Sequence, residues 1–263
     1  GCDHPTPDTG CAGLMVEYKP KRTGSSGRSS GAPGQSRELA VRVKSARGRK
    51  NSSTRWLQRQ LNDPYVAAAK RDGYRGRAAY KLLEMNDKLK FLAKGKRVVD
   101  LGCAPGGWLQ VAVQYCGEGK VVGIDLLPTE PVAGAEVIVG DVRENADMDR
   151  VRELLGGHKA DIVLSDMAAS STGHKATDHL RIVALIEISL DFAHEVLAEG
   201  GWFIVKILQG GAQGELQRTL AQCFDKVRVI KPPASRSDSS EAYIAASGYR
   251  PQAVQGAEPA SES

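Results

Sequence analysis

A glycine-rich turn interrupts the apolar sequence VVDLGCAPGGW at residues 98–108. Gly102, Gly106 and Gly107 follow a run of β-forming residues and precede a helical segment, so they lie where a strand turns into its helix. Glycines lack a Cβ atom, which lets a ligand approach the backbone closely and lets the turn adopt unusual φ values. The pattern G-x-A-x-G-G is a loose relative of the dinucleotide fingerprint G-x-G-x-x-G, so the turn alone indicates a nucleotide-like ligand only weakly.

Four carboxylates sharpen this indication, because all are expected at the same edge of one sheet. Asp100 precedes the turn, and the next three expected strands end in Asp125, Asp141 and Asp166. Asp125 is placed to bind ribose hydroxyls, and Asp141 lies where an adenine would bind. Any one of these acids could instead cap a helix or face solvent. Together they favour an adenosine-bearing ligand with positive charge, S-adenosylmethionine, over NAD, whose pyrophosphate prefers glycines and helix N–H groups.

Two lysines and two acids could act on a substrate beside that ligand. They are Lys81 in AAYKLLEM, Asp166 in LSDM, Lys206 in FIVKIL and Glu241 in SSEAYIAASG. The strands that end near Asp166 and Lys206 adjoin the ligand crevice, so both side chains are expected to face the transferred group. Each residue also has a structural interpretation: Lys206 as a strand-end lysine that extends to water, Lys81 as a basic residue of a solvated helix, Glu241 as the partner of an arginine.

Alternating strands and helices must position these residues. Strands are expected at 97–102, 120–127, 135–142, 160–167, 200–208, 226–232 and 241–249. Helices are expected at 55–73 and 76–92 ahead of them, and near 107–115, 147–156, 178–198 and 214–223 between them. This order predicts an α/β protein with a doubly wound, mostly parallel sheet covered on both faces. Residues 233–240 are too few for a crossover helix, so the last two strands are expected to pair antiparallel.

The composition predicts one folded domain with extensions. The chain has 263 residues and is 41% hydrophobic, which suffices for one core. Residues 1–50 are rich in Gly, Ser, Pro and basic residues and are expected to be a disordered arm, 51–250 to be the folded domain, and 251–263 to be a disordered tail. Residues 19–59 hold twelve Lys or Arg against one acid, which indicates a polyanionic partner, although a solubilising tail has the same composition.

The same composition excludes several other classes. No segment approaches the ~18 apolar residues of a membrane span, and the N-terminus lacks the charged-then-apolar pattern of a secretion signal. The five cysteines are scattered and form no CxxC pair, which argues against a disulfide framework or a zinc site. We therefore expect a cytoplasmic protein with no membrane partner and no bound metal.

In sequence order, the motifs VVDLGCAPGGW, DLLP, GDVRE, LSDMA, FIVK and SSEAYIAASG resemble the FtsJ/RlmE family of ribosomal RNA uridine 2′-O-methyltransferases. The stretch SSTRWLQRQLNDPYVAAAKRDGYRGRAAYKL is also similar to bacterial members, so the resemblance covers residues 52–250. It implies the Rossmann-like class I methyltransferase fold, with a seven-stranded sheet whose last strand is antiparallel. It further implies S-adenosylmethionine-dependent methylation of a ribose 2′-hydroxyl of a uridine in 23S ribosomal RNA, on the assembled 50S subunit, by a monomer.

The resemblance also implies residue roles. The Lys-Asp-Lys-Glu tetrad of the family matches Lys81, Asp166, Lys206 and Glu241, with Lys206 as the proton acceptor. Its cofactor-binding residues match Gly106, Trp108, Asp125, Asp141 and Asp166. Apart from the resemblance, positive charge and, for Ser235 and Arg236, a place in the loop next to Glu241 lead us to expect RNA contacts at Arg55, Arg75, Arg77, Ser235 and Arg236. Two positions depart from the family pattern: Asp238 stands where a basic residue is common, and SSTG at 170–173 replaces an Asn-containing stretch.

Several alternatives stay open at this point. A ribose 2′-hydroxyl is a poor nucleophile, so the placement of the reactants can supply much of the catalysis. Lys206 is then either a general base or a residue that orients the hydroxyl while the proton leaves late to water. The substrate could also be tRNA or another rRNA nucleotide. A non-catalytic RNA-binding ribosome-assembly factor and a nicotinamide oxidoreductase are the alternatives from other classes, and the acidic strand ends disfavour the oxidoreductase.

Overall fold

The computed structural model describes residues 57–58, 60–168, 174–209 and 213–251. All of them fall in one compact unit, Ala40–Ser263. The predicted arm at 1–50, Arg55, the SSTG stretch at 170–173 and the tail from residue 252 lie outside the described residues.

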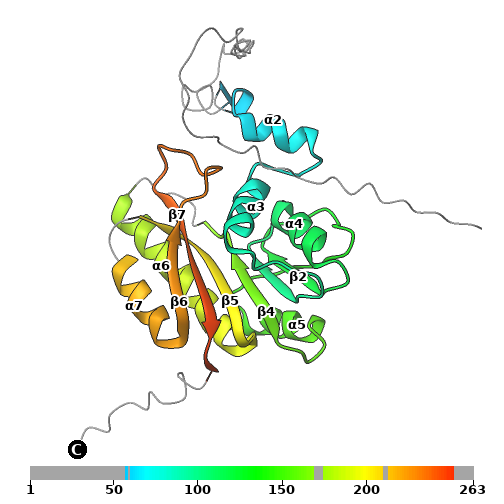
Figure 1. Cartoon of the computed structure of the whole chain (residues 1–263), viewed down its shortest axis with the longest axis vertical. Helices are drawn as coiled ribbons and strands as arrows, with labels where there is room; N and C mark the ends of the chain where they lie inside the picture. Colours follow the sequence, from blue (N-terminus) through cyan, green and yellow to red (C-terminus); the bar gives the residue numbers. More distant parts are fainter. Residues whose placement is uncertain (1–56, 59, 169–173, 210–212, 252–263) are drawn as a thin grey trace, which may run out of the picture. The chain divides into compact units, whose positions relative to one another are not determined.

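Seven strands form one sheet in the order β3-β2-β1-β4-β5-β7-β6 (Figure 1). The strands are β1 (Val98–Leu101), β2 (Val121–Asp125), β3 (Glu136–Val139), β4 (Ala160–Ser165), β5 (Leu197–Leu208), β6 (Phe224–Ile230) and β7 (Glu241–Tyr249). β7 pairs antiparallel with both β5 and β6, whereas the other neighbouring pairs are parallel. The predicted seven-stranded, mostly parallel α/β sheet with an antiparallel last strand is confirmed, and β7 lies between β5 and β6.

Helices cover both faces of this sheet and divide the interior into two cores. The helices are α2 (Pro64–Arg71), α3 (Ala78–Leu89), α4 (Gly107–Cys116), α5 (Asn145–Leu154), α6 (Lys175–Val196) and α7 (Gln213–Cys223). Buried residues of α2, α3 and α4 share one core with one face of the strands, and those of α5, α6 and α7 share the other. The predicted doubly wound arrangement is therefore present.

Alternation along β5 decides which face its lysine joins. Phe203, Val205 and Ile207 lie in the core that α6 and α7 cover, and Ile204 lies in the core that α3 and α4 cover. Successive side chains of a strand point to opposite faces, so Lys206 shares the face of Ile204. The lysine is thereby directed to the side of the sheet on which α3 lies.

The continuous helix expected at 55–73 is wrong at Asp63, where the chain leaves one helical segment and starts α2. Pro64 is the first residue of α2, and the Asp63 side chain accepts a hydrogen bond from the Tyr65 N–H at 3.0 Å. Proline has a φ that suits the start of a helix but disfavours helical backbone in the residue before it. The Asp-Pro pair therefore ends one helix and caps the next.

Candidate active site

The two lysines and two acids singled out in the sequence come from four elements and meet at one edge of the sheet. Lys81 is on α3, Asp166 follows β4 directly, Lys206 is in β5 and Glu241 begins β7. The carboxyl end of a parallel strand and the start of an antiparallel neighbour lie at the same edge, which brings Glu241 beside Lys206. The structure therefore gathers all four side chains, which we call the tetrad.

Each lysine of the tetrad contacts both acids. Lys81 Nζ lies 2.7 Å from Glu241 Oε1 and 3.9 Å from Asp166 Oδ2. Lys206 Nζ lies 2.7 Å from Asp166 Oδ1 and 3.8 Å from Glu241 Oε2. The lysine side chains are 12% and 10% exposed and those of the acids 17%, so the charges are largely withdrawn from water. Alternating signs compensate each charge, which a partly buried cluster requires.

Tyr243 contacts the tetrad and was not singled out from the sequence. Its buried hydroxyl donates a hydrogen bond to Asp166 Oδ1 at 2.6 Å, and its ring centroid is 5.7 Å from Lys81 Nζ. Burial, followed by the charges of Asp166 and Glu241, raises the pKa of Tyr243 far above its ordinary value, so the hydroxyl stays a donor. The E-x-Y spacing in β7 was the available signal, because residues two apart share a face.

Glu241 is held as a carboxylate. Burial acts to raise its pKa, but the charge and hydrogen bond of Lys81, the charge of Lys206 and a hydrogen bond from Ser235 outweigh burial. The pKa of Glu241 therefore lies below its ordinary value. At neutral pH the site contains this anion between two lysines.

The glycine turn follows β1, as its sequence predicted. Gly102 and Gly106 adopt φ values of 79° and 103°, in the region that favours glycine. Asp125 at the end of β2 accepts hydrogen bonds from the N–H groups of Ala104 and Leu127, both at 2.8 Å. The glycine turn and an acid at the next strand end thus lie together, which suits a ribose-bearing ligand.

The side chain of Asp100, just before the turn, is buried. It is 1% exposed, and within the described part of the chain neither of its carboxyl oxygens has a hydrogen-bond partner. Burial, followed by the charges of Asp166 and Asp125, raises its pKa well above the ordinary value. A buried carboxyl without partners is costly unless a ligand supplies a donor or a positive charge. The site therefore fits a cationic ligand, such as one that carries an ammonium and a sulfonium.

The other predicted cofactor residues occupy different surroundings. The Trp108 indole is 3% exposed and donates through Nε1 to the Ala78 carbonyl at 2.8 Å, which ties α4 to α3. Asp141 follows β3 by two residues, and a hydrogen bond from Arg143 lowers its pKa against the opposing effect of burial. Trp108 thus belongs to the first turn of α4, directly after the glycines, and Arg143 orients the carboxylate of Asp141.

Arg75, predicted as an RNA contact, lies at the glycine turn instead of beside the tetrad. Its Nη1 donates to the carbonyls of Pro105 at 3.0 Å and Glu130 at 2.5 Å. Its Nη2 donates to the carbonyl of Pro131 at 2.6 Å. The guanidinium thereby joins the turn after β1 to the loop after β2.

Arg77 and Arg236 do line a polar recess of about 400 Å³ that opens beside the tetrad. The recess is lined by Gln60, Arg77, Ala78, Lys81, Arg236, Asp238, Ser239 and Glu241. Ser235, the remaining predicted RNA contact among the described residues, is 5% exposed and does not line it. Asp238, which departs from the family pattern, is part of its wall.

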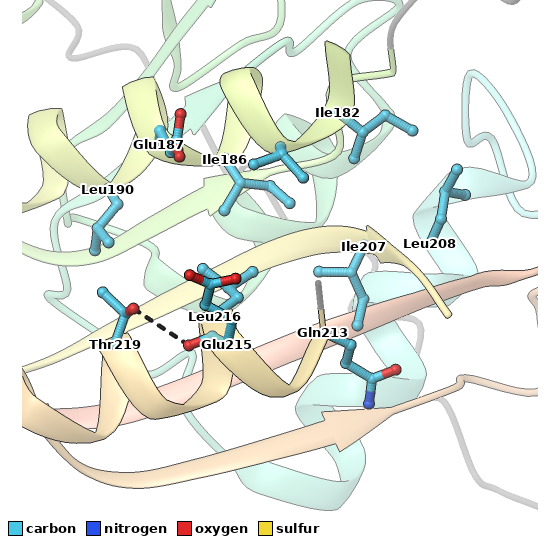
Figure 2. A pocket seen from close by; sticks show the side chains of 11 residues that line it. Ile182, Ile186, Glu187, Leu190, Ile207, Leu208, Gln213, Glu215, Leu216 and Thr219 are labelled. Carbon is cyan, nitrogen blue, oxygen red and sulfur yellow. Dashed lines mark hydrogen bonds between the residues drawn. The ribbon is translucent and has the colours of Figure 1, made fainter. Parts of the chain in front are cut away.

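A second cavity of about 200 Å³ lies between α6, β5 and α7 (Figure 2). Figure 2 shows the apolar side chains of Ile186, Leu190 and Ile207 around it. Ile207 follows Lys206 in β5 and points to the opposite face, so this cavity lies across the sheet from the tetrad. Its apolar lining belongs to the core of that face.

The described part of the chain contains no group of three or more His, Cys, Asp or Glu side chains that could hold a metal ion. Among its helices, none combines the length and the apolar character that a membrane crossing requires.

The fold and the site define the class of protein. A doubly wound sheet with a glycine turn after β1, acids at successive strand ends and a buried carboxyl without a hydrogen-bond partner is the arrangement of a Rossmann-like methyltransferase. The FtsJ-like methyltransferase family matches residues 74–249. The chain belongs to this family and is a methyltransferase, which confirms the resemblance seen in the motifs.

Individual relatives agree with the family. The "Ribosomal RNA large subunit methyltransferase E" of Ruegeria pomeroyi is 60% identical over 223 residues, covering 81% of this chain and 95% of that protein. The protein of the same name from Roseobacter denitrificans is 57% identical over 244 residues, covering 89% and 99%. A crystal structure of a ribosomal RNA methyltransferase from Plasmodium falciparum superposes with a TM-score of 0.61 at 34% identity, covering 67% of this chain and 98% of that one.

Proposed function

We propose that this methyltransferase transfers the methyl group of S-adenosylmethionine to the 2′-hydroxyl of a uridine in 23S ribosomal RNA, within the assembled large subunit. The observation that carries the proposal is the convergence of Lys81, Asp166, Lys206 and Glu241 in one charge-compensated cluster. The names of the relatives support a ribosomal RNA of the large subunit as the substrate. We further propose that one copy of the chain is sufficient and that it acts in the cytoplasm.

The strand ends would hold S-adenosylmethionine, which supplies an electrophilic methyl group on a sulfonium when it is bound. Gly106 and the first turn of α4, which includes Trp108, offer backbone groups to the amino acid portion. Asp125 would accept hydrogen bonds from the ribose hydroxyls and Asp141 would face the adenine. Asp166 belongs to the tetrad, and its charge acts on Asp100 beside the turn. The unpartnered carboxyl of Asp100 would gain a cationic neighbour.

Lys206 would accept the proton of the 2′-hydroxyl while the bond between that oxygen and the methyl carbon forms and the bond from the methyl carbon to the sulfonium sulfur breaks, which would leave S-adenosylhomocysteine, a neutral thioether. Its Nζ is fixed by Asp166 twice, through Oδ1 and through the backbone carbonyl, both at 2.7 Å. Lys206 must first release one proton to water, and after the reaction it returns to the ammonium form. Lys81 and Glu241 would hold the hydroxyl in line, since correct placement lowers the barrier substantially.

RNA would enter through the recess beside the tetrad. The 2′-hydroxyl distinguishes RNA from DNA, so the site itself selects the nucleic acid. Arg77 and Arg236 would contact phosphates next to the target ribose, and the basic residues at 19–59 would contact phosphates farther away. The folded domain is proposed to span residues 51–250.

Methyl-labelled S-adenosylmethionine and unmethylated large subunits test the proposal, with free 23S rRNA and tRNA as alternative substrates. Lys206→Ala serves as the inactive variant, and Lys226→Ala, a change of an exposed lysine on β6, is the matched control. Label is expected in one uridine 2′-oxygen with wild type and with Lys226→Ala, and not with Lys206→Ala. Label in tRNA would mean that tRNA, and not 23S rRNA, is the substrate. No label in any RNA, despite binding of S-adenosylmethionine, would overturn the enzymatic proposal in favour of a binding factor.

A further inference from the structure

Ser235 contacts the tetrad directly, although it was predicted to contact RNA. Its hydroxyl donates a hydrogen bond to Glu241 Oε1 at 2.8 Å. The same oxygen lies 2.7 Å from Lys81 Nζ. Ser235 is 5% exposed, which leaves little of it for a substrate to touch. Its hydroxyl and the lysine together determine how the Glu241 carboxylate is turned.

Both backbone polar groups of Ala234, the residue before Ser235, form hydrogen bonds with side chains. The Ala234 N–H donates to Glu84 Oε2 at 2.6 Å, and the Ala234 carbonyl accepts a hydrogen bond from Arg77 Nη2. Ala234 itself is fully buried. Arg77 is the N-cap of α3 and Glu84 lies within α3, the helix on which Lys81 also lies. These two hydrogen bonds, which we call the clamp, therefore fix the loop of Ser235 to the same helix that supplies one lysine of the tetrad.

The two clamping side chains are fixed in turn by the region that starts α2. Arg77 Nη1 pairs with Asp63, whose side chain is 9% exposed. The Tyr65 hydroxyl donates to Glu84 Oε1 at 2.7 Å. Asp63 Oδ2 also lies 3.6 Å from Arg236 Nη2 in the same loop. The region that starts α2 is thus connected to Glu241 through three consecutive contacts: its pairs with Arg77 and Glu84, their hydrogen bonds to Ala234, and the hydrogen bond from Ser235 to Glu241.

We propose that Ser235 is a positioning residue for Glu241, and that Glu84 and Arg77 act on the tetrad by clamping Ala234. This proposal rests on the proposed methyl transfer and adds a residue that prepares its site. Substrate contact is not its role. Glu84 lies outside the recess and acts only through the Ala234 backbone.

The charged and titratable groups around Glu241 allow a test of this role by pH. Lys81 faces it from α3, Lys206 from β5, Asp166 from the end of β4 and Tyr243 from β7, while Arg236 follows Ser235 in the loop. The hydrogen bond from the Ser235 hydroxyl favours the ionised carboxylate. Its removal leaves both lysines in place, so the pKa of Glu241 should rise without a loss of the ion pairs.

Ser235→Ala is the primary variant, Ser235→Thr restores a hydroxyl, and Ser237→Ala is the matched control on an exposed serine of the same loop. Loss of one hydrogen bond to a charged group predicts that kcat falls about tenfold in Ser235→Ala. KM for the large subunit and the affinity for S-adenosylmethionine should stay within about twofold. Ser235→Thr should recover most of kcat. Glu84→Ala should lower kcat similarly, and the double variant should be no slower than the slower single variant.

A second readout needs no substrate, so it separates this inference from the proposed reaction. The carboxyl ¹³C resonance of Glu241, assigned with Glu241→Gln, is titrated in wild type and variants, and its midpoint should move to higher pH in Ser235→Ala only. A wild-type protein without activity would overturn the proposed function while this titration still tests the contact. An unchanged kcat and midpoint in Ser235→Ala would overturn the positioning role. A raised KM for the subunit at constant kcat would return Ser235 to RNA binding.

Discussion

Tyr243→Phe removes one hydroxyl from the base of the tetrad and keeps the ring. The hydroxyl donates to Asp166 Oδ1 at 2.6 Å, and the ring is fully buried between the sheet and the helices. Because the phenylalanine ring fills the same space, the variant leaves no cavity of the size that a large-to-small change creates. The expected effects therefore come from the lost hydrogen bond.

The size of the effect follows from the remaining partners of Asp166. A hydrogen bond to a charged group contributes about 1.5–3 kcal/mol. Asp166 keeps Lys206 at 2.7 Å and Lys81 at 3.9 Å, so the carboxylate stays paired and the loss should lie at the lower limit of that range. A loss of about 1.5 kcal/mol that appears in the transition state lowers kcat about tenfold. The free energy of unfolding should fall by a similar amount.

Tyr249→Phe is the matched control, because its ring is also buried and its hydroxyl donates to the His194 carbonyl at 3.1 Å. That bond is neutral and lies at the opposite end of β7 from Glu241. Both variants should lower the free energy of unfolding in urea, whereas only Tyr243→Phe should lower kcat in the methyl-transfer assay. If Tyr243→Phe matched wild type in kcat while losing stability, the idea that Tyr243 orients Asp166 would be refuted.

Further predictions concern the base, the turn, the buried acid and the arm. Lys206→Arg keeps the charge but cannot serve as a base. If Lys206→Arg and Lys206→Ala lower the rate of methyl transfer by the same large factor, Lys206 acts in proton transfer. Partial activity in Lys206→Arg would instead support a role in orienting the hydroxyl. Arg75→Lys cannot reach three carbonyls with a planar fork and should weaken S-adenosylmethionine binding about tenfold in calorimetry, with Lys226→Ala unchanged. The raised pKa of Asp100 means that the folded state retains a proton that the unfolded state releases, so stability of the ligand-free protein should fall as pH rises above about 4; Asp100→Asn should flatten that slope in urea unfolding. Affinity for free 23S rRNA should fall steeply with salt, and deletion of residues 1–50 should reduce the slope of log affinity against log salt.

The sequence predicted the sheet and the tetrad for a definite physical reason. Parallel strands connected by helices end at one edge of the sheet, so the sequence alone predicts that Asp166 and Lys206 lie near the glycine turn. Glu241 required one further step, since the short connection before it forces an antiparallel pair. The sequence did not indicate that β7 lies between β5 and β6, and this insertion is what brings Glu241 against Lys206.

Contacts between distant segments explain what the sequence could not predict. Arg75 and Ser235 were assigned to RNA from charge and from loop position. Their partners in the structure are the carbonyls of the cofactor-side loops and the carboxylate of Glu241. A guanidinium that donates to three backbone carbonyls and one beside a phosphate have the same sequence signature, so only the packing of the chain distinguishes them. The break at Asp63 is different, because the Asp-Pro pair already contained its signal.

Lys206 shows how the fold itself creates the site. It stands among Ile204, Val205 and Ile207 in a strand covered on both faces, where a charged side chain would be costly. The apolar neighbours of Lys206 cannot solvate its charge. The carboxylate of Asp166, which directly follows the adjacent strand β4, offsets the cost of burying that charge. The same alternation that buries the flanking apolar residues directs Nζ to the edge of the sheet where Asp166 lies. A shift of the β5 register by one residue would send the lysine into the opposite core, which makes correct strand pairing a condition for catalysis as well as for stability.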